Sequence, residues 1–155
     1  MANFVFNIAK GRVAQYLQNV EDGSPANSRI KIVPLETTGL EADAALKDHN
    51  DLAALLAGTS NEQTTLGRKT WAAADLALVV DDANERFDAD SVDIVWAAAT
   101  GNAVSALITV YFPDGVTPGA DSTGIPLTKH DFVVTPDGSD ITAQLAAAGF
   151  FRATD

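Results

Sequence analysis

The run Ala103–Phe112 constrains the fold more than any other part of the sequence. It is rich in β-branched and aromatic residues and is apolar at both odd and even positions for much of its length. Because side chains alternate between the two faces of a strand, a strand of this kind is buried on both sides. We therefore expect it at the centre of a sheet or sandwich, where it forms the core. The two tryptophans, Trp71 and Trp96, are expected to be core residues as well.

The chain after residue 64 carries the alternating patterns and turn residues that are typical of antiparallel β structure. Leu76–Val80 and Val92–Trp96 are predicted strands on either side of an acidic, turn-like stretch, although the alanine-rich segment Trp71–Val80 would also suit a helix. Pro136–Gly138 has the sequence Pro-Asp-Gly, which supplies the backbone angles of a tight turn. We therefore predict a hairpin in which Phe132–Thr135 pairs with Ile141–Leu145.

The first part of the chain predicts two helices with a strand between them. Apolar residues recur at helical spacing from Ala9 to Val20, and this pattern predicts the first helix. Arg29–Leu35 has the composition of a strand. The second helix is short and has its core at Asp51–Ala57, with Asp48 or Asn50 as the candidate cap.

These patterns together predict an α+β fold. An N-terminal helix and a short second helix are expected to pack on an antiparallel β-sheet or β-sandwich. A chain of 155 residues fits one domain, 1–155, which divides into a helix–strand–helix part (1–60) and a mainly antiparallel β part (61–155). The last apolar segment, Gly149–Arg152, is expected to add an edge strand or to dock the C-terminus.

The sequence is strongly acidic, with 21 Asp and Glu residues against 10 Lys and Arg residues and a formal net charge of −11. Such a surface repels phosphate backbones and anionic lipid headgroups, because nucleic-acid affinity comes mainly from cationic side chains that displace counterions. No stretch approaches the roughly 20 apolar residues that a membrane helix needs, and the N-terminus lacks the pattern of a signal peptide. We therefore expect neither nucleic acid nor a membrane as a partner.

The residues that the common kinds of catalysis require are missing from the sequence. There is no cysteine, and His49 and His130 are the only histidines. There is no Gly-x-Ser-x-Gly motif, no Gly-x-Gly pair and no phosphate-binding loop with its lysine. His130 beside Asp131 has the residue types of a base and its orienting acid, but neighbouring residues on a strand point to opposite faces. We therefore predict that the protein is not an enzyme and has neither a catalytic residue nor a cofactor.

An acidic stretch between Asp75 and Asp93 is the most charged part of the chain. Hard cations such as calcium are bound by several carboxylate and carbonyl oxygens, which this stretch could supply. The candidate ligands are Asp81, Asp82, Asp88 and Asp90. Their spacing is not that of an EF-hand, which has a glycine at the sixth loop position and a glutamate at the twelfth. We favour the alternative, which is a solvated acidic turn between strands.

Short segments spread along nearly the whole chain carry a family resemblance. They are Asn7–Ala14, Gly39–Asp43, Leu52–Leu56, Asp81–Asp88 running on to Trp96, Pro126–Phe132 and Thr135–Gly138. These segments resemble small proteins that are encoded in the structural-gene modules of tailed bacteriophages, especially phages of actinobacteria. The shared motifs are turns and element ends, so no functional residue is carried over. The resemblance implies a virion component that is assembled in the host cytoplasm.

The resemblance, the acidity and the missing catalytic residues together predict a structural protein of the virion. The first hypothesis is a capsid decoration or auxiliary protein, which binds the outside of the major capsid lattice as a homo-oligomer and stabilises the shell. The second is a tail or head-fibre accessory with a receptor-binding role, exposed through the loop Val116–Gly124. The third, of another class, is a calcium- or carbohydrate-binding module that uses the acidic stretch.

Overall fold

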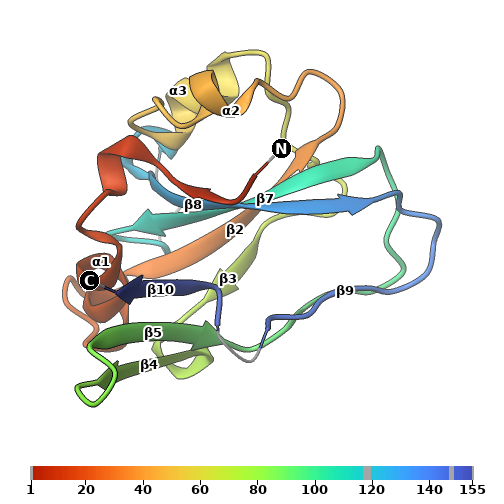
Figure 1. Ribbon diagram of the computed structural model, residues 1–155. Helices are drawn as coiled ribbons and strands as arrows, with labels where there is room; N and C mark the ends of the chain where they lie inside the picture. The colour runs from red at the N-terminus through yellow and green to blue at the C-terminus, as the bar shows by residue number, and fades with distance from the viewer. Residues whose placement is uncertain (1, 117–119, 147–148, 155) are drawn as a thin grey trace.

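The structure, a computed structural model, describes residues 2–116, 120–146 and 149–154. Its centre is a five-stranded antiparallel sheet (Figure 1). The strands lie in the order β1 (Phe4–Val5), β8 (Ile125–Val134), β7 (Val104–Phe112), β2 (Arg29–Glu36) and β3 (Lys69–Trp71). The middle strand is β7, and all of its residues are buried. The predicted central strand is therefore confirmed.

Two smaller sheets form a second layer against one face of the large sheet (Figure 1). The first is antiparallel and has the order β10 (Phe151–Thr154), β5 (Arg86–Ser91) and β4 (Leu76–Asp81). The second consists of β6 (Ile94–Trp96) and β9 (Ile141–Ala143). The C-terminal segment thus adds an edge strand, which is one of the two outcomes that the sequence predicted for it.

Helices cover both faces of the large sheet. The α-helices are α1 (Val13–Glu21), α2 (Asp43–Leu46) and α3 (Leu52–Ala57), and the 3-10 helices are η1 (Asn7–Ala9), η2 (Ala73–Asp75) and η3 (Asp121–Thr123). Helix α1 contacts β2, β4 and β5, so it belongs to the second layer, whereas α2 and α3 lie over the opposite face (Figure 1). The fold is α+β, with helices packed on antiparallel sheets, as predicted.

Two hydrophobic cores bury the large sheet, one on each face. The first lies between this sheet and the second layer and includes both tryptophans, of which Trp71 is 3% and Trp96 is 2% exposed. The second lies between the sheet and the helices α2 and α3, where Leu52 is fully buried. Side chains alternate along β7, so the neighbours Leu107 and Ile108 enter different cores. Burial of both tryptophans is as predicted.

The predicted hairpin around Pro136–Gly138 does not form. Phe132–Val134 is the end of β8 and pairs with β7, whereas Ile141–Ala143 is β9 and pairs with β6. The turn residues therefore connect the two layers instead of two paired strands. Gly138 has φ of +95°, and its N–H donates a 2.7 Å hydrogen bond to the carbonyl of Ala99. This long-range bond holds the turn, and local turn residues do not reveal which strand will accept the returning chain.

The strand that pairs with β4 is the acidic stretch itself. The sequence predicted strands at Leu76–Val80 and Val92–Trp96 around an acidic turn, and the first of these is β4. Its partner is β5, so the turn shrinks to residues 82–85, and β6 belongs to another sheet. Within β5, Phe87 and Ala89 contribute to the first core, while Asp88 lies on the opposite face. Although this stretch is acidic, its side chains alternate between the core face and the opposite face, which is the pattern of a half-buried strand.

The two predicted N-terminal helices differ from the structure at their first residues. The first helix starts at Val13 instead of Ala9, because Gly11 has φ of +74° and interrupts the helical backbone. The second helix is capped by Asp51, whose Oδ1 accepts a 2.8 Å hydrogen bond from the amide of Ala54. That bond satisfies one of the free amides at the helix start, so the predicted caps Asp48 and Asn50 are wrong.

Lys129 of β8 is a fully buried charge that fastens the N-terminal strand. Its side chain is 0% exposed, and its ammonium group binds Asp131, lies 3.1 Å from Asp43 Oδ1 and donates to the carbonyl of Ala2 at 3.2 Å. Burial alone would raise the pKa of Asp43, but the Ala2 amide and the Lys129 ammonium together lower it. One lysine thus joins β1, β8 and α2, which come from distant parts of the sequence.

Replacing Lys129 with methionine should destabilise the fold while it keeps the volume of the side chain. Loss of the ammonium leaves two partly buried carboxylates without their cation, so we expect the free energy of unfolding to fall by about 2 kcal/mol. Urea unfolding followed by circular dichroism measures this change. The matched control is Lys10→Met at an exposed position, which should change stability by less than about 0.5 kcal/mol. Equal effects of the two variants would contradict the assigned role of Lys129.

Arg68 ties the segment before β3 to the loop that contains η3. Its guanidinium makes paired hydrogen bonds to Glu62, at 2.8 and 2.6 Å, and to Asp121, at 2.6 and 2.8 Å. The planar fork of arginine suits two carboxylates of this kind. The hydrogen bonds from Arg68 lower the pKa of Asp121, and the same contacts raise the pKa of Arg68.

The Arg68–Asp121 contact should make part of the stability depend on pH. Because the folded pKa of Asp121 is lowered, its contribution is complete above the unfolded value of about 3.9 and disappears as the pH falls through the lower folded value. Asp121→Asn should therefore cost about 1 kcal/mol at neutral pH, and this cost should shrink as the pH falls below about 4. Urea unfolding of both proteins across this range tests the expectation. A cost that persists unchanged into strong acid would show that Asp121 acts through packing alone.

Candidate functional site

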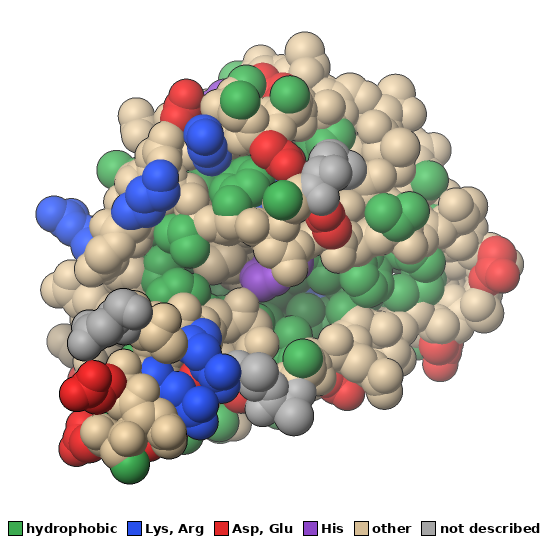
Figure 2. All heavy atoms as spheres, viewed as in Figure 1, with side chains coloured by type: hydrophobic (Ala, Val, Ile, Leu, Met, Phe, Trp, Pro, Cys, Tyr) green, Lys and Arg blue, Asp and Glu red, His purple; other side chains and the backbone are tan. Residues whose placement is uncertain are grey.

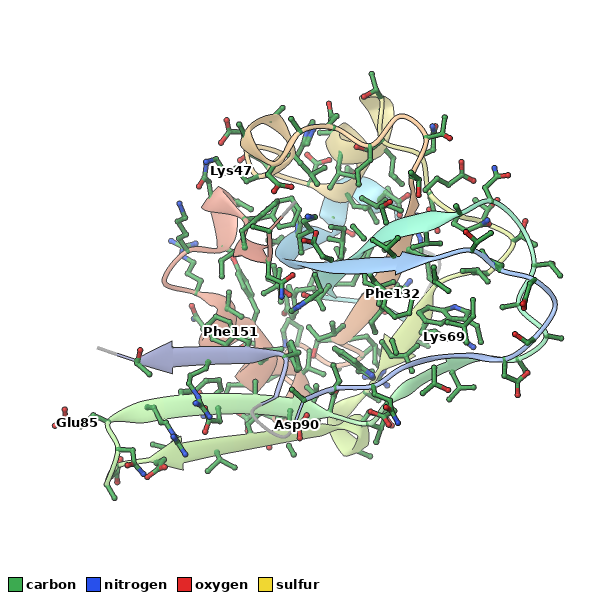
Figure 3. All side chains as sticks on the ribbon, turned by 45° about the vertical axis from the view of Figure 1, so that its right-hand side comes forward. Lys47, Lys69, Glu85, Asp90, Phe132 and Phe151 are labelled. Carbon is green, nitrogen blue, oxygen red and sulfur yellow. The ribbon has the colours of Figure 1, made fainter. Side chains whose placement is uncertain are left out.

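The candidate cation ligands all lie on the hairpin formed by β4 and β5. Asp81 ends β4, Asp82 is in the turn, and Asp88 and Asp90 are in β5. Figure 3 shows Glu85 at the tip of this hairpin, directed away from the body of the protein, and Asp90 toward the other end of β5. The candidate ligands are thus spread along the hairpin.

Arginines on the outer face of the hairpin engage two of these carboxylates. Arg86 lies 3.1 Å from Asp81 and 3.0 Å from Asp88, and Arg152 of β10 binds Asp88 from the next strand. The hydrogen bond from Arg152 lowers the pKa of Asp88, to which Arg86 adds its charge. The result is a ladder of alternating charges across the three strands. These contacts balance part of the negative charge of the hairpin.

No cluster of metal ligands is found within the described ranges 2–116, 120–146 and 149–154, since no three His, Asp or Glu side chains meet in a way that could hold an ion. Asp82 is exposed on the turn, and the Asp90 side chain accepts a 2.8 Å hydrogen bond from the amide of Ser91. Asp82 and Asp90 thus have separate surroundings along the hairpin.

The outer edge of β4 is exposed and apolar. In the described part of the chain, β4 pairs with β5 on one side and with no strand on the other. Val79 is 53% and Val80 is 68% exposed, and Val92, which follows β5, is 52% exposed. Edge strands of stable monomers are usually short, charged or covered, because unpaired backbone groups beside apolar side chains invite another strand. The exposed part of β4 is apolar, so this edge is a candidate interface.

Sequence reasoning placed the strand but did not reveal its open edge. The run Leu76–Val80 has the composition of a buried strand, and its five residues alternate too little to show which side faces water. Exposure depends on the width of the second layer, which ends at β4. A strand of apolar residues next to a cluster of charges is a signal that could have been used, because such charges often flank exposed apolar strands.

The two histidines belong to elements outside the hairpin and have different partners. His49 Nε2 is 2.7 Å from Glu41 Oε2, next to the helices α2 and α3. His130 of β8 contacts Thr128 at 2.8 Å, while its neighbour Asp131 binds Lys129 on the other face of the strand. His130 and Asp131 therefore do not form the base and orienting acid that their adjacency suggests, as strand alternation predicted.

Comparisons with known proteins give no further assignment: no family model, no curated protein and no solved structure matches this chain. Within its described residues, the protein has no helix with both the length and the apolar character needed to cross a bilayer.

Calcium titration separates the two interpretations of the acidic hairpin. Because Arg86 and Arg152 occupy two of its carboxylates, we expect no saturable calcium binding by isothermal calorimetry at millimolar concentrations. Asp82→Ala and Asp88→Ala serve as the paired variants. A saturable heat in the parent protein that either variant removes would contradict this expectation and support the cation-binding module.

Proposed function

We propose that this chain is a structural protein of a tailed-phage particle, where it decorates the outer capsid surface and stabilises the shell. The observation that carries this proposal is the apolar edge of β4, where Val79 and Val80 are exposed and the outer backbone groups pair with no strand of the described structure. A neighbouring subunit can cover this edge by adding a strand, in which backbone hydrogen bonds give affinity and side-chain pockets give specificity. The phage-like segments of the sequence support the same assignment.

The charge of the protein supports assembly onto a basic or neutral partner. The formal net charge is −11, and exposed acids stand near the β4 edge at Asp82 and Glu85. Like charges keep free subunits apart in solution, whereas a partner strand flanked by Lys or Arg would be attracted over intermediate distances. The partner in this proposal is the major capsid protein or another virion protein, and the chain itself associates as a homo-oligomer within the particle.

A tail or head-fibre accessory is the second structural hypothesis. It assigns the contact with the host to the loop Val116–Gly124, of which residues 117–119 lie outside the described part of the structure. The β4 edge would serve either location, so copy number distinguishes them. Quantitative mass spectrometry of virions should give hundreds of copies for a decoration protein. A few to a few dozen copies would instead support the tail or head fibre and reject decoration.

Placing a charge on the β4 edge should prevent incorporation without unfolding the protein. In Val80→Lys the edge strand carries an exposed cation, which is a common natural protection of edge strands against strand addition. We expect the fraction of particles that carry the protein to fall at least about tenfold, since several apolar and backbone contacts are lost together. Mixing purified protein with particles that lack it, followed by sedimentation, measures the effect.

The matched control is Val133→Lys on β8, where the parent valine is 80% exposed in the large sheet. Both variants add the same charge and should keep the thermal midpoint of the parent within a few degrees. Incorporation of Val80→Lys at the level of Val133→Lys would reject β4 as the attachment edge.

A further inference from the structure

A cavity of about 440 Å³ lies between the large sheet and the second layer. It follows the seam between the two small sheets, because its walls include Ala143 of β9 and Phe151 of β10. Figure 2 shows it as the dark hollow at the centre of that face, beside a histidine and lined by hydrophobic side chains. Its volume falls within the range of small-molecule sites in proteins.

Aromatic rings form one wall of the cavity. The ring centroids of Trp71 and Phe150 are 5.0 Å apart, and His130 meets Phe150 edge-on at 6.5 Å. Gly149 fixes this wall in place: its φ is +78°, and an added Cβ would lie 2.2 Å from the carbonyl oxygen of Ala89. The amide of Phe150 donates to that same carbonyl at 2.9 Å. The aromatic wall is therefore held by backbone contacts and offers a preformed surface to a planar ring.

A chain of polar side chains crosses the floor of the cavity. The hydroxyls of Thr109 and Thr128 are 2.5 Å apart, and the Thr128 hydroxyl is 2.8 Å from His130 Nε2. The amide of Thr128 also donates to the Thr109 hydroxyl at 3.2 Å. Both threonines are buried, so each hydroxyl proton needs an acceptor among these polar side chains.

The hydrogen-bond donors and acceptors along this row of side chains determine the tautomer of His130. Among the described residues, the Thr109 hydroxyl forms hydrogen bonds only with Thr128, so it must donate to the Thr128 hydroxyl. The Thr128 hydroxyl must then donate to Nε2 of the neutral imidazole. The reverse order would leave the buried Thr109 proton without an acceptor. Burial lowers the pKa of His130, and the charge of Lys129 lowers it further, so the ring is neutral at neutral pH. The proton of the ring is therefore on Nδ1.

We propose that this cavity is a binding site for a neutral, ring-containing small molecule that bears a carbonyl oxygen. The Nδ1–H of His130 has no hydrogen-bond partner among the described residues and lies in a ring that lines the cavity, so it can donate to that oxygen. The charged residues among the described lining are Lys129 and Asp131. The buried Lys129 ammonium binds Asp131 and lies 3.1 Å from Asp43, so it is not available to an anionic ligand. The aromatic wall receives the ring of the ligand.

Two probes of nearly the same shape test both parts of this proposal. Acetophenone has an aromatic ring and a carbonyl oxygen, and α-methylstyrene replaces that oxygen with a CH₂ group. Titration of the ¹⁵N-labelled protein, followed by amide chemical shifts, should show saturable changes for both probes around Thr128, His130 and Phe150. Acetophenone should bind about two- to tenfold more tightly, which is the effect of one net hydrogen bond.

Variants of the polar chain separate the hydrogen bond from the cavity. His130→Phe keeps a ring but removes the hydrogen-bond donor. Both probes should still bind this variant, with about equal affinities. If this variant does not fold, Thr128→Val serves instead, because it removes the contact that fixes the tautomer and should reduce the same preference. Val95→Thr, at an exposed position of β6 that does not line the cavity, is the control and should leave both affinities unchanged.

The proposal has defined ways to fail. Absence of saturable shifts with both probes up to their solubility limits, or shifts confined to residues away from the cavity, would overturn it. Equal affinities of the two probes for the parent protein would overturn the role of His130 Nδ1, as would an acetophenone preference that survives in both His130→Phe and Thr128→Val.

Discussion

The burial of β7 on both faces is the constraint on which the rest of the structure depends. All residues of β7, from Val104 to Phe112, are buried, so the strand needs a partner strand on each edge and a covering layer on each face. Strands β2 and β8 supply the edges. The helices α2 and α3 cover one face, and the small sheets with α1 cover the other. Although β7 is antiparallel to its neighbours, it is covered on both faces, as strands of parallel sheets usually are.

A few Lys and Arg side chains pair with carboxylates at places where distant segments of the chain meet. Lys129 joins the N-terminal strand to β8 and α2, and Arg68 joins Glu62 to Asp121. On the hairpin, Arg86 and Arg152 bridge carboxylates across three strands. Since the chain has 10 Lys and Arg residues against 21 acids, each bridging cation that contacts two carboxylates reduces repulsion at the place where repulsion would separate segments. Most of the remaining negative charge can then stay in solvent.

The features that composition alone decides could be predicted from the sequence. The central strand β7 was predicted because β-branched and aromatic residues fill both of its faces, and the short helix α3 because Leu and Ala follow a capping region. The α+β class follows from these local patterns. Their common property is that neighbouring residues determine them.

Features that depend on distant residues could not be predicted in this way. Pro136–Gly138 has the residues of a hairpin turn, but the partners of β8 and β9 lie in different layers. Lys129 stands in a polar run, and its burial depends on Asp43 and Ala2, which only the fold brings near. The cavity wall depends on Gly149 meeting β5. In each case the sequence contains the residues, whereas their pairing is a property of the assembled sheets.

The open edge and the cavity have one physical origin, which is the mismatch between the two layers. The large sheet has five strands, while the layer below it is divided into a sheet of three and a sheet of two that share no backbone ladder. Strand β4 ends that layer, so its outer backbone groups are unpaired within the described structure. The seam between the two small sheets leaves a cavity next to Thr109, Thr128 and His130 that no side chain of the described residues fills. A continuous second layer would close the seam and add core, but it would also remove both accessible features. The divided second layer therefore leaves apolar surface unburied at the β4 edge and in the cavity. Another molecule can bury that surface at both places.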